Sequence, residues 1–316
     1  MTTVSGSPGP VVVGYADDHS DVALDWAAEE ALRLGVELQL LHSYSAETSY
    51  PWGYGYPLPA GDIARVEAAV HERAADLLRT VEERTREAHP SLSVTAAIAR
   101  GSAPASLVAA SAEASTVVVG RRARHAWSPA LGSVSLPVAA HAACPVVVVP
   151  SREPDEGPAA PAPAAEHPAA GQVVLGLDDS PECADATAFA FAQASARGLG
   201  VVAVHAWWVD PAMAVPLVTD WDEVADAEQL GTDTLLAPWR DRYPDVPVTR
   251  VLARGKAADA LVQAAGGAAL LVVGSRGRGG FASLLLGSVS RRVLARASCP
   301  VAVVHRGQLP ERGLGH

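Results

Sequence analysis

Residues 271–274, Leu-Val-Val-Gly, form a short aliphatic run that ends on a glycine, and residues 117–120, Val-Val-Val-Gly, repeat it. Short runs that are rich in β-branched residues and bounded by glycine are typical of strands buried on both faces. Such strands belong to parallel sheets whose faces are covered by helices. The repeated run therefore predicts an α/β fold that occurs twice in the chain.

The similarity between the two halves extends well beyond this run. Residues 131–135 and 286–290 both read Leu-Gly-Ser-Val-Ser, and a Cys-Pro-Val segment recurs at 144–146 and 299–301. Between the copies, residues 151–171 are rich in proline and alanine, a composition that favours extended, semi-rigid backbone. We therefore predict a first domain over residues 1–150, a linker over 151–171, a second domain over 172–306 and a tail over 307–316.

Within each copy, short apolar runs alternate with longer segments of helical period, which is the pattern of βαβ units. Each domain is thus predicted to be doubly wound, with a five-stranded parallel sheet between helices. In the first copy we predict strands at Val11–Tyr15, Val36–Ser43, Val94–Arg100, Thr116–Gly120 and Val146–Val149, and helices at Asp21–Leu34, Ile63–Ala88, Ala105–Ala112 and Ser133–Ala143. In the second copy we predict strands at Val173–Leu177, Val201–Ala206, Val248–Ala253, Leu270–Gly274 and Val301–His305.

Composition and charge exclude several classes of protein. The chain has 316 residues, 49% of them hydrophobic and 19% charged, which is ordinary for a globular protein with two cores. Its formal net charge of −11 argues against a nucleic-acid-binding surface, because such surfaces neutralise phosphates with lysine and arginine. No apolar run is long enough to cross a membrane, and the three distant cysteines show neither a disulfide framework nor metal-ligand spacing. We expect a cytoplasmic protein that binds neither nucleic acid nor membrane.

The most specific motif is the segment 274–277, Gly-Ser-Arg-Gly, followed after nine residues by Gly287 and Ser288. Glycines let backbone N–H groups approach a phosphate closely, and a helix that starts after Gly287 would offer unpaired donors and the positive end of its dipole. The motif is not a Walker loop, since no Lys-Ser or Lys-Thr follows its glycines. It predicts a phosphate-binding loop, and the alternative for the glycines alone is a flexible surface loop.

Both copies resemble the universal stress protein family over nearly their whole length, and the ATP-binding branch of that family carries Gly-x-x-Gly, nine residues, then Gly-Ser or Gly-Thr. The resemblance implies a Rossmann-like domain of the adenine nucleotide hydrolase-like type, with an ATP site and Mg²⁺ in the second copy. Residues 176–180, Gly-Leu-Asp-Asp-Ser, are similar to the family's Val-Asp-Gly-Ser segment. The nucleotide-binding residues that the resemblance implies are Asp178, Ala206, Val273, Gly274, Gly277, Gly287, Ser288 and Val289.

The loop of the first copy departs from this pattern. The position of the second glycine holds Ala123, and eight residues, not nine, separate Ala123 from Gly132. If Gly277 has a positive φ, alanine at the equivalent position would cost roughly 1 kcal/mol or more. Nucleotide binding in the first copy is therefore predicted to be weak or lost.

The segment after the first strand of this copy is irregular as well. It aligns with the second copy only with a one-residue gap, so that either Asp17 is displaced from the position of Asp178 or Ala16 takes that position. The residues left for a weaker second site are Asp17, Gly120, Gly132 and Ser133, with charge from Arg121, Arg122 and Arg124.

Other reactive side chains are interpreted as structural. His42 and His205 are lone histidines at matching strand ends. Cys144 and Cys299 precede proline at the start of a buried strand, and Cys183 falls where a helix should begin, without a neighbouring base. We assign none of these residues to catalysis.

The arginines near the loop are divided into two pairs. Arg276 and Arg278 are placed to face phosphate oxygens, whereas Arg291 and Arg292 on the following helix are interpreted as a solvated face.

Two functions from different classes remain open. The first is a non-enzymatic ATP-binding protein that acts in a stress response or in dormancy, in which bound nucleotide changes conformation or partners. The alternative is an enzyme, a slow ATPase or a nucleotidyl-transfer enzyme of the adenine nucleotide hydrolase-like fold. We favour the first, because the sequence shows no paired acid and base and no nucleophile with an orienting partner.

The last strand of each copy, Val146–Val149 and Val301–Val304, is apolar throughout and is predicted to lie at a sheet edge. In the family that the chain resembles, the equivalent strands of two domains pair across a two-fold axis. The resemblance therefore implies an intrachain pseudo-dimer, with any further homodimer built on a different surface.

Overall fold

The computed structural model describes residues 9–44, 60–121, 132–150, 169–207, 221–277 and 285–308. The described residues up to 150 form one compact unit, and those from 169 onward form another. None of the described helices is long and apolar enough to cross a membrane.

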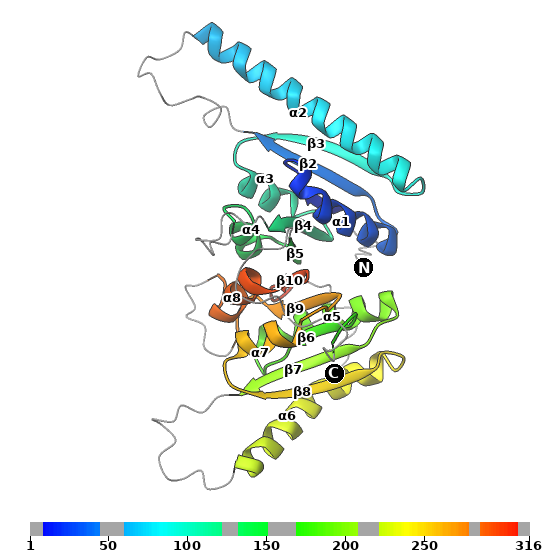
Figure 1. Cartoon of the computed structure of the whole chain (residues 1–316), viewed down its shortest axis with the longest axis vertical. Helices are drawn as coiled ribbons and strands as arrows, with labels where there is room; N and C mark the ends of the chain where they lie inside the picture. The colour runs from blue at the N-terminus through cyan, green and yellow to red at the C-terminus, as the bar shows by residue number, and fades with distance from the viewer. Residues whose placement is uncertain are drawn as a thin grey trace, which may run out of the picture. The chain divides into compact units, whose positions relative to one another are not determined.

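The first unit is a doubly wound α/β domain (Figure 1). All pairs in its sheet are parallel, in the order β3-β2-β1-β4-β5. Its elements are β1 (Val11–Gly14), the 3₁₀ turn η1 (Asp18–Ser20), α1 (Asp21–Leu34), β2 (Leu38–Tyr44), α2 (Ala60–Ala88), β3 (Val94–Arg100), α3 (Ala103–Ala110), β4 (Thr116–Arg121), α4 (Ser135–His141) and β5 (Val146–Pro150).

The second unit repeats this order as β8-β7-β6-β9-β10, again with parallel pairs. Its elements are β6 (Val173–Gly176), α5 (Pro181–Arg197), β7 (Val201–Trp207), α6 (Trp221–Arg242), β8 (Val248–Arg254), α7 (Ala257–Ala264), β9 (Leu270–Gly274), α8 (Ser288–Arg296) and β10 (Val301–Val304). The five-stranded doubly wound sheet predicted for each copy is confirmed.

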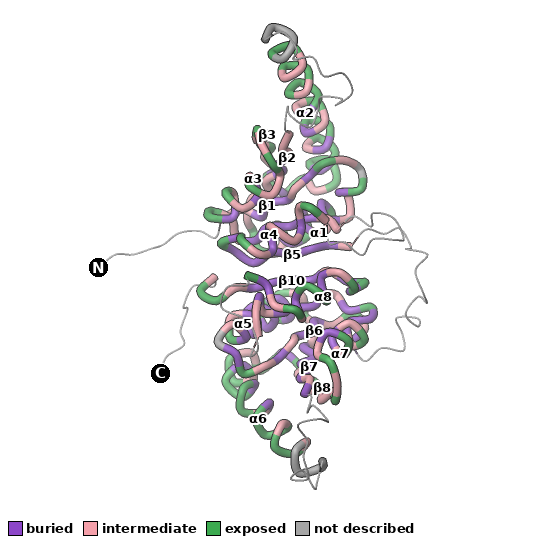
Figure 2. Tube along the Cα trace, turned by 90° about the vertical axis from the view of Figure 1, so that its left-hand side faces the viewer, coloured by how far each residue is buried: buried purple, intermediate pink, exposed green. Residues whose placement is uncertain are grey.

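The central strands of both sheets are buried because helices cover both faces, as the purple tube shows (Figure 2), whereas the outer strands β3 and β8 are only half-buried. In the second unit, the ring of Phe191 on α5 stacks on Trp239 of α6, with ring centroids 6.0 Å apart. Phe191 also contacts the ring of Tyr243. These aromatic contacts hold the C-terminal half of α6 against α5.

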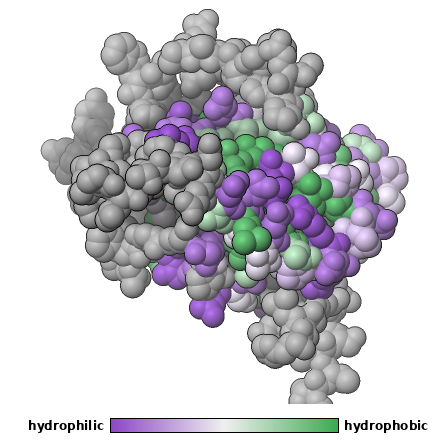
Figure 3. Space-filling model, turned by 90° about the horizontal axis from the view of Figure 1, so that it is seen from below, coloured by the Kyte–Doolittle hydropathy of each residue, from purple (hydrophilic) through white to green (hydrophobic). Residues whose placement is uncertain are grey.

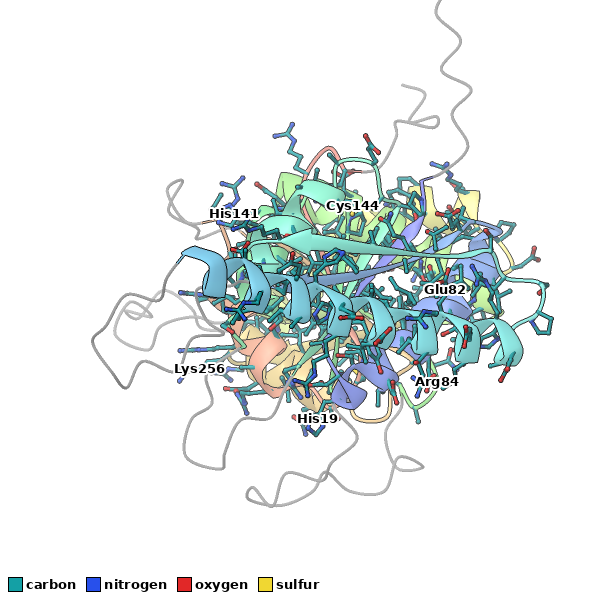
Figure 4. All side chains as sticks on the ribbon, turned by 90° about the horizontal axis from the view of Figure 1, so that it is seen from above. His19, Glu82, Arg84, His141, Cys144 and Lys256 are labelled. Carbon is teal, nitrogen blue, oxygen red and sulfur yellow. The ribbon has the colours of Figure 1, made fainter. Side chains whose placement is uncertain are left out.

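Helix α1 has the predicted bounds because its ends carry clear signals. Gly35 adopts a left-handed conformation at φ 64°, and its N–H caps the last carbonyls of the helix. At the start, Asp21 accepts a hydrogen bond of 2.8 Å from the hydroxyl of Tyr15. Arg84 on α2, labelled in Figure 4, pairs with the same carboxylate at 2.6 Å. The network ties α2 to the end of β1.

Three helices of the first unit differ from the prediction. Helix α3 covers Ala103–Ala110, two residues before the predicted Ala105–Ala112. Helix α2 begins at Ala60, three residues before the predicted Ile63. Helix α4 begins at Ser135, two residues after the predicted Ser133, and ends at His141. Pro137 explains the later start, because a helix from Ser133 would need an N–H at residue 137 to bond the carbonyl of Ser133.

Candidate functional site

The second unit contains a cavity of about 480 Å³ at the carboxyl ends of β6 and β9. In this unit β6 lies between β7 and β9, so the strand order reverses between β6 and β9. Doubly wound sheets bind their ligands at this switch point, and the volume is in the range of small-molecule sites. All eight residues predicted for the nucleotide site line the cavity, namely Asp178, Ala206, Val273, Gly274, Gly277, Gly287, Ser288 and Val289.

The two ends of the glycine-rich loop are pinned together by hydrogen bonds. The N–H of Gly287 donates to the carbonyl oxygen of Ser275 at 2.8 Å. The hydroxyl of Ser290 donates to the carbonyl oxygen of Gly274 at 2.7 Å, and lies 3.2 Å from that of Ser275. The start of α8 is therefore held beside the end of β9, although residues 278–284 separate them outside the described part of the chain.

No side chain caps the N-terminus of α8, so its first backbone N–H groups are available to a ligand. Its cap residue is Gly287, in an extended conformation at φ −68° and ψ 163°, and glycine has no side chain that could cap the helix. The first N–H groups of a helix have no partner within the helix, and they carry the positive end of its dipole. Ser288, at the first helical position, is exposed and lines the cavity. This end of α8 can receive an anion.

Asp178 follows β6 and is the one carboxylate among the described residues that line the cavity. The backbone N–H of Ser180 donates to its Oδ1 at 3.0 Å, and the hydroxyl of Ser180 donates to the same oxygen at 2.5 Å. The backbone N–H of Asp178 itself donates to the sulfur of Cys183 at 3.3 Å. The carboxylate is thus held by one oxygen, which aims the other at the glycine-rich loop.

Gly277 does not have the positive φ that the sequence analysis considered. Glycine is favoured here for a different reason, since a Cβ at residue 277 would meet Oδ2 of Asp178 at 2.6 Å. Alanine at this position would force the carboxylate or the loop to move.

The inner wall of the cavity is apolar. It is formed by Leu261 and Ala257 of α7 together with Val204, Ala206 and Val273 of the sheet. The strand end at Gly176 allows this approach, because a Cβ there would meet Leu261 and Val273 side chains at 3.2 Å. A flat apolar ring fits such a wall, while the loop and Asp178 supply polar groups at the other end.

Two arginines, Arg276 and Arg291, line the cavity together with Asp178. Arg276 lines the cavity and pairs with Glu182 of α5 at 3.0 Å. Arg291, which we interpreted as part of a solvated face, is exposed and also lines the cavity. Arg292 is exposed. Arg278 lies outside the described residues.

Cys183 lines the cavity, but its surroundings do not activate the thiol. Burial raises its pKa to about 11, and the hydrogen bond from the N–H of Asp178 offsets only part of this effect. Burial also raises the pKa of Cys144, labelled in Figure 4, to about 12. The structure thus supports the interpretation of both thiols as structural. In the part of the chain that the structure describes, no three His, Cys, Asp or Glu side chains are grouped to hold a metal ion.

The two strand-end histidines make the same backbone contact. Nδ1 of His42 lies 2.9 Å from the carbonyl oxygen of Tyr15, and Nδ1 of His205 lies 2.9 Å from that of Leu177. Nε2 of His205 lies a further 2.9 Å from Oε2 of Glu228 on α6. Both rings fix the loop that follows the first strand of their copy.

The first copy lacks the carboxylate of the second. The N–H of Tyr15 bonds to the carbonyl of Leu41, as that of Leu177 bonds to Val204, so Ala16 and not Asp17 stands where the second copy has Asp178. This resolves the two alignments that the sequence left open.

The described part of the first copy's loop differs as well. Ser133 and Val134 form a turn before α4, and in the second copy Ser288, the equivalent of Ser133, is already helical. The hydroxyl of Ser135, which matches Ser290, has no hydrogen-bond partner among the described residues. Strand β4 runs one residue beyond the predicted end at Gly120, to Arg121, and Ala123, Arg122 and Arg124 lie outside the described part of the chain.

Several lining residues were not predicted. The sequence marks some of them as special, and it gives no indication for others. Ser290 repeats in the Leu-Gly-Ser-Val-Ser segment, so the repeat itself marked it. Leu261 and Ala257 sit on a helix whose apolar face the sequence shows, but only the fold tells which end of that face meets the cavity.

The chain matches the model of the Universal stress protein family over residues 9–150 and 170–305. A universal stress protein of Mycobacterium tuberculosis (strain ATCC 25618 / H37Rv) is 37% identical over 305 residues, covering 96% of this chain and 98% of that protein. A crystal structure of a universal stress protein from Archaeoglobus fulgidus DSM 4304 superposes with a TM-score of 0.65 at 18% identity, over 95% of this chain and 97% of that one. That likeness concerns the fold.

Some solved universal stress proteins hold nucleotides. One is in complex with cAMP, and one from Archaeoglobus fulgidus is in complex with dAMP. The latter is 23% identical, with a TM-score of 0.31, over 45% of this chain and 98% of that one. These ligands are properties of those two proteins.

Proposed function

This chain belongs to the universal stress protein family, and from that premise we propose that its second copy binds ATP with Mg²⁺ and acts in a stress response or dormancy as a nucleotide-dependent regulatory protein. The observation that carries the proposal is the cavity in which all eight predicted residues meet. The first copy is proposed to bind nucleotide weakly or not at all.

The chemistry of the cavity matches the three parts of a nucleotide. The apolar wall of Leu261, Ala206 and Val273 suits the faces and edge of a purine. The carboxylate of Asp178 accepts hydrogen bonds, as ribose hydroxyls require. The uncapped N-terminus of α8 and the hydroxyl of Ser288 suit phosphate oxygens.

The groups present also fit a magnesium ion that arrives with the phosphates. Mg²⁺ is commonly held by one or two carboxylates or hydroxyls together with substrate phosphates and water. Among the described lining residues, Asp178, Ser288 and Ser290 carry side-chain oxygens, and the hydroxyl of Ser290 is already bonded to the carbonyl of Gly274. When bound, the ion would neutralise phosphate charge, while the chain's own groups orient the nucleotide.

A regulatory role is proposed over turnover because of what surrounds Asp178. Efficient hydrolysis needs a general base placed at the attacking water. Among the described lining residues Asp178 is the one carboxylate, and its Oδ1 is already engaged by Ser180. A carboxylate held in this way positions a ligand better than it moves protons.

Isothermal titration calorimetry of the full chain with Mg²⁺ and ATP tests the proposal. We expect saturable binding that Asp178→Ala weakens and Asp226→Ala, an exposed carboxylate of α6, leaves unchanged. Mass spectrometry of ligand released from the purified protein identifies the nucleotide. Absence of heat with ATP, ADP and AMP, together with no released nucleotide, would contradict the proposal.

A further inference from the structure

The side of β7 that faces away from the cavity carries a buried link to helix α6. Val204 and Ala206 line the cavity, and His205 lies between them in the chain with 4% of its surface exposed. Its Nδ1 contacts the carbonyl oxygen of Leu177, the residue before Asp178, at 2.9 Å. Its Nε2 contacts Oε2 of Glu228 at 2.9 Å. One imidazole therefore connects the loop of the cavity with α6.

The chemistry of these contacts shows which atoms of the link must carry protons. A carbonyl oxygen only accepts hydrogen bonds, so Nδ1 of His205 must carry a proton and donate it to Leu177. The contact between Nε2 and the carboxylate of Glu228 needs one more proton between the two atoms. Replacing Glu228 with alanine removes this partner and leaves the buried ring fixed at one end only.

The first copy provides a natural comparison. Helices α2 and α6 end in matching turns, where Leu92 bonds to His89 as Val246 bonds to Tyr243. Counting back from these turns by the same number of residues places Ala74 where the second copy has Glu228. His42 keeps the bond to the carbonyl of Tyr15. The histidine–carbonyl bond thus belongs to the fold, whereas the carboxylate occurs in the copy that has Asp178.

We infer that His205 and Glu228 couple the cavity to the N-terminal half of α6, so that a nucleotide bound at Asp178 tightens this helix. The C-terminal half is held separately, by the stacking of Trp239 on Phe191. The inference rests on the proposed function, and it makes His205 and Glu228 positioning residues whose effect passes through Leu177. Coupling of this kind is reciprocal, so loosening α6 at Glu228 lowers nucleotide affinity.

A second ion pair on the same helix supplies a matched control. Asp233 of α6 pairs with Arg250 of β8 and, at 3.0 Å, with Arg240. None of these three residues lines the cavity. Asp233→Ala therefore removes an α6 carboxylate and its ion pairs without touching the His205 link.

Hydrogen–deuterium exchange with and without Mg²⁺ and ATP, combined with calorimetry, tests the coupling in the full chain. In the wild type we expect ATP to slow exchange in the N-terminal half of α6 and not in α2. Glu228→Ala should abolish this slowing and lower ATP affinity about fivefold. Glu228→Gln should retain most of both, because its amide can donate to an unprotonated Nε2. Asp233→Ala should leave the affinity unchanged.

The outcomes separate the inference from the proposed function. If the wild type binds ATP but α6 is not slowed, or is slowed equally in Glu228→Ala, the coupling is wrong and the binding proposal stands. The coupling is also wrong if Asp233→Ala lowers affinity as much as Glu228→Ala. If calorimetry shows no ATP binding to the wild type, the proposed function fails and the inference falls with it.

Discussion

The carboxylate of Asp178 lies against the backbone of Gly277, so closely that a methyl group on residue 277 would stand 2.6 Å from Oδ2. Ser180 fixes the other oxygen, which limits how far the carboxylate can swing away. The glycine and the acid are therefore one feature of the site, although they lie 99 positions apart in the sequence.

Replacing Gly277 with valine should remove most ATP binding, because the side chain meets Asp178 and displaces it. Calorimetry measures the loss, and we expect at least a tenfold weaker affinity, about 1.4 kcal/mol. Gly231→Ala is the matched control, since a Cβ at this position in α6 meets nothing within 4 Å. Ala123→Val in the first copy should also change little. Equal losses from Gly277→Val and Ala123→Val would contradict the assignment of the site to the second copy.

The control variant carries a prediction of its own. Glycine in a helix is less favourable than alanine by about 1 kcal/mol, and Gly231 lies within α6. Gly231→Ala should therefore raise the free energy of unfolding of the second unit by up to this amount in urea titrations. An unchanged or lower value would show that the helix tolerates or uses flexibility at this point.

Removing the hydroxyl of Ser290 should loosen the junction between β9 and α8. Ser290→Ala loses the 2.7 Å hydrogen bond to the carbonyl of Gly274, at a cost of about 1 kcal/mol in unfolding free energy. ATP affinity should fall with it. Ser135→Ala removes the equivalent hydroxyl of the first copy, which has no partner among the described residues, and should cost less. Equal costs would argue against the pinning role of Ser290.

The stability of the second unit should fall at alkaline pH through Cys183. Burial raises the pKa of this thiol from 9.0 to about 11, so the folded state holds its proton more tightly than the unfolded state. This contribution is fully present below pH 9 and is lost as the pH rises from 9 to 11; two pKa units correspond to roughly 2 to 3 kcal/mol. Urea unfolding of wild type and Cys183→Ala at pH 8 and 10.5 measures it. The prediction fails if both proteins lose the same stability over this range.

Turnover of ATP should be slow. Asp178 is the one carboxylate in the described lining, and Ser180 holds one of its oxygens, so we expect phosphate release far below the rate of about 10 per second that is typical of enzymes. A coupled phosphate assay at saturating Mg²⁺ and ATP gives the rate. Release near that typical rate, lost in Asp178→Ala, would favour the enzyme over the regulatory protein.

Much of the fold could be predicted because its signals are local. The valine runs mark the strands, and Gly35 marks the end of α1. The later start of α4 was not predicted, although Pro137, which lacks an N–H, carries the signal. The first and last residues of a helix are often decided by a single glycine or proline of this kind.

The candidate site was predictable where a motif carries it and not where only packing does. Gly274, Gly287 and Ser288 stand in one spaced pattern. The reason for Gly277 was wrong, because the contact with Asp178 joins segments that are distant in sequence. The lining position of Arg291 was missed for a related reason, since a helical period does not show which polar residue of α8 faces the loop.

On the face that is seen from below, hydrophilic and hydrophobic residues are mixed, and this mixture does not mark a site (Figure 3). Leu230 of α6 is 70% exposed. Isolated apolar side chains of this kind are common on protein surfaces and carry no function by themselves.

The contact between Asp178 and Gly277 also constrains the order in which such a site can evolve. The first copy has alanine at both positions, Ala16 and, by sequence, Ala123. With the geometry of the second copy, an acid gained while alanine occupies position 277 would meet the methyl group, whereas a glycine gained first leaves room for the acid. The reverse path is open, because a copy that has lost its acid no longer selects against alanine in the loop. Decay of a duplicated domain is thus easier than its recovery.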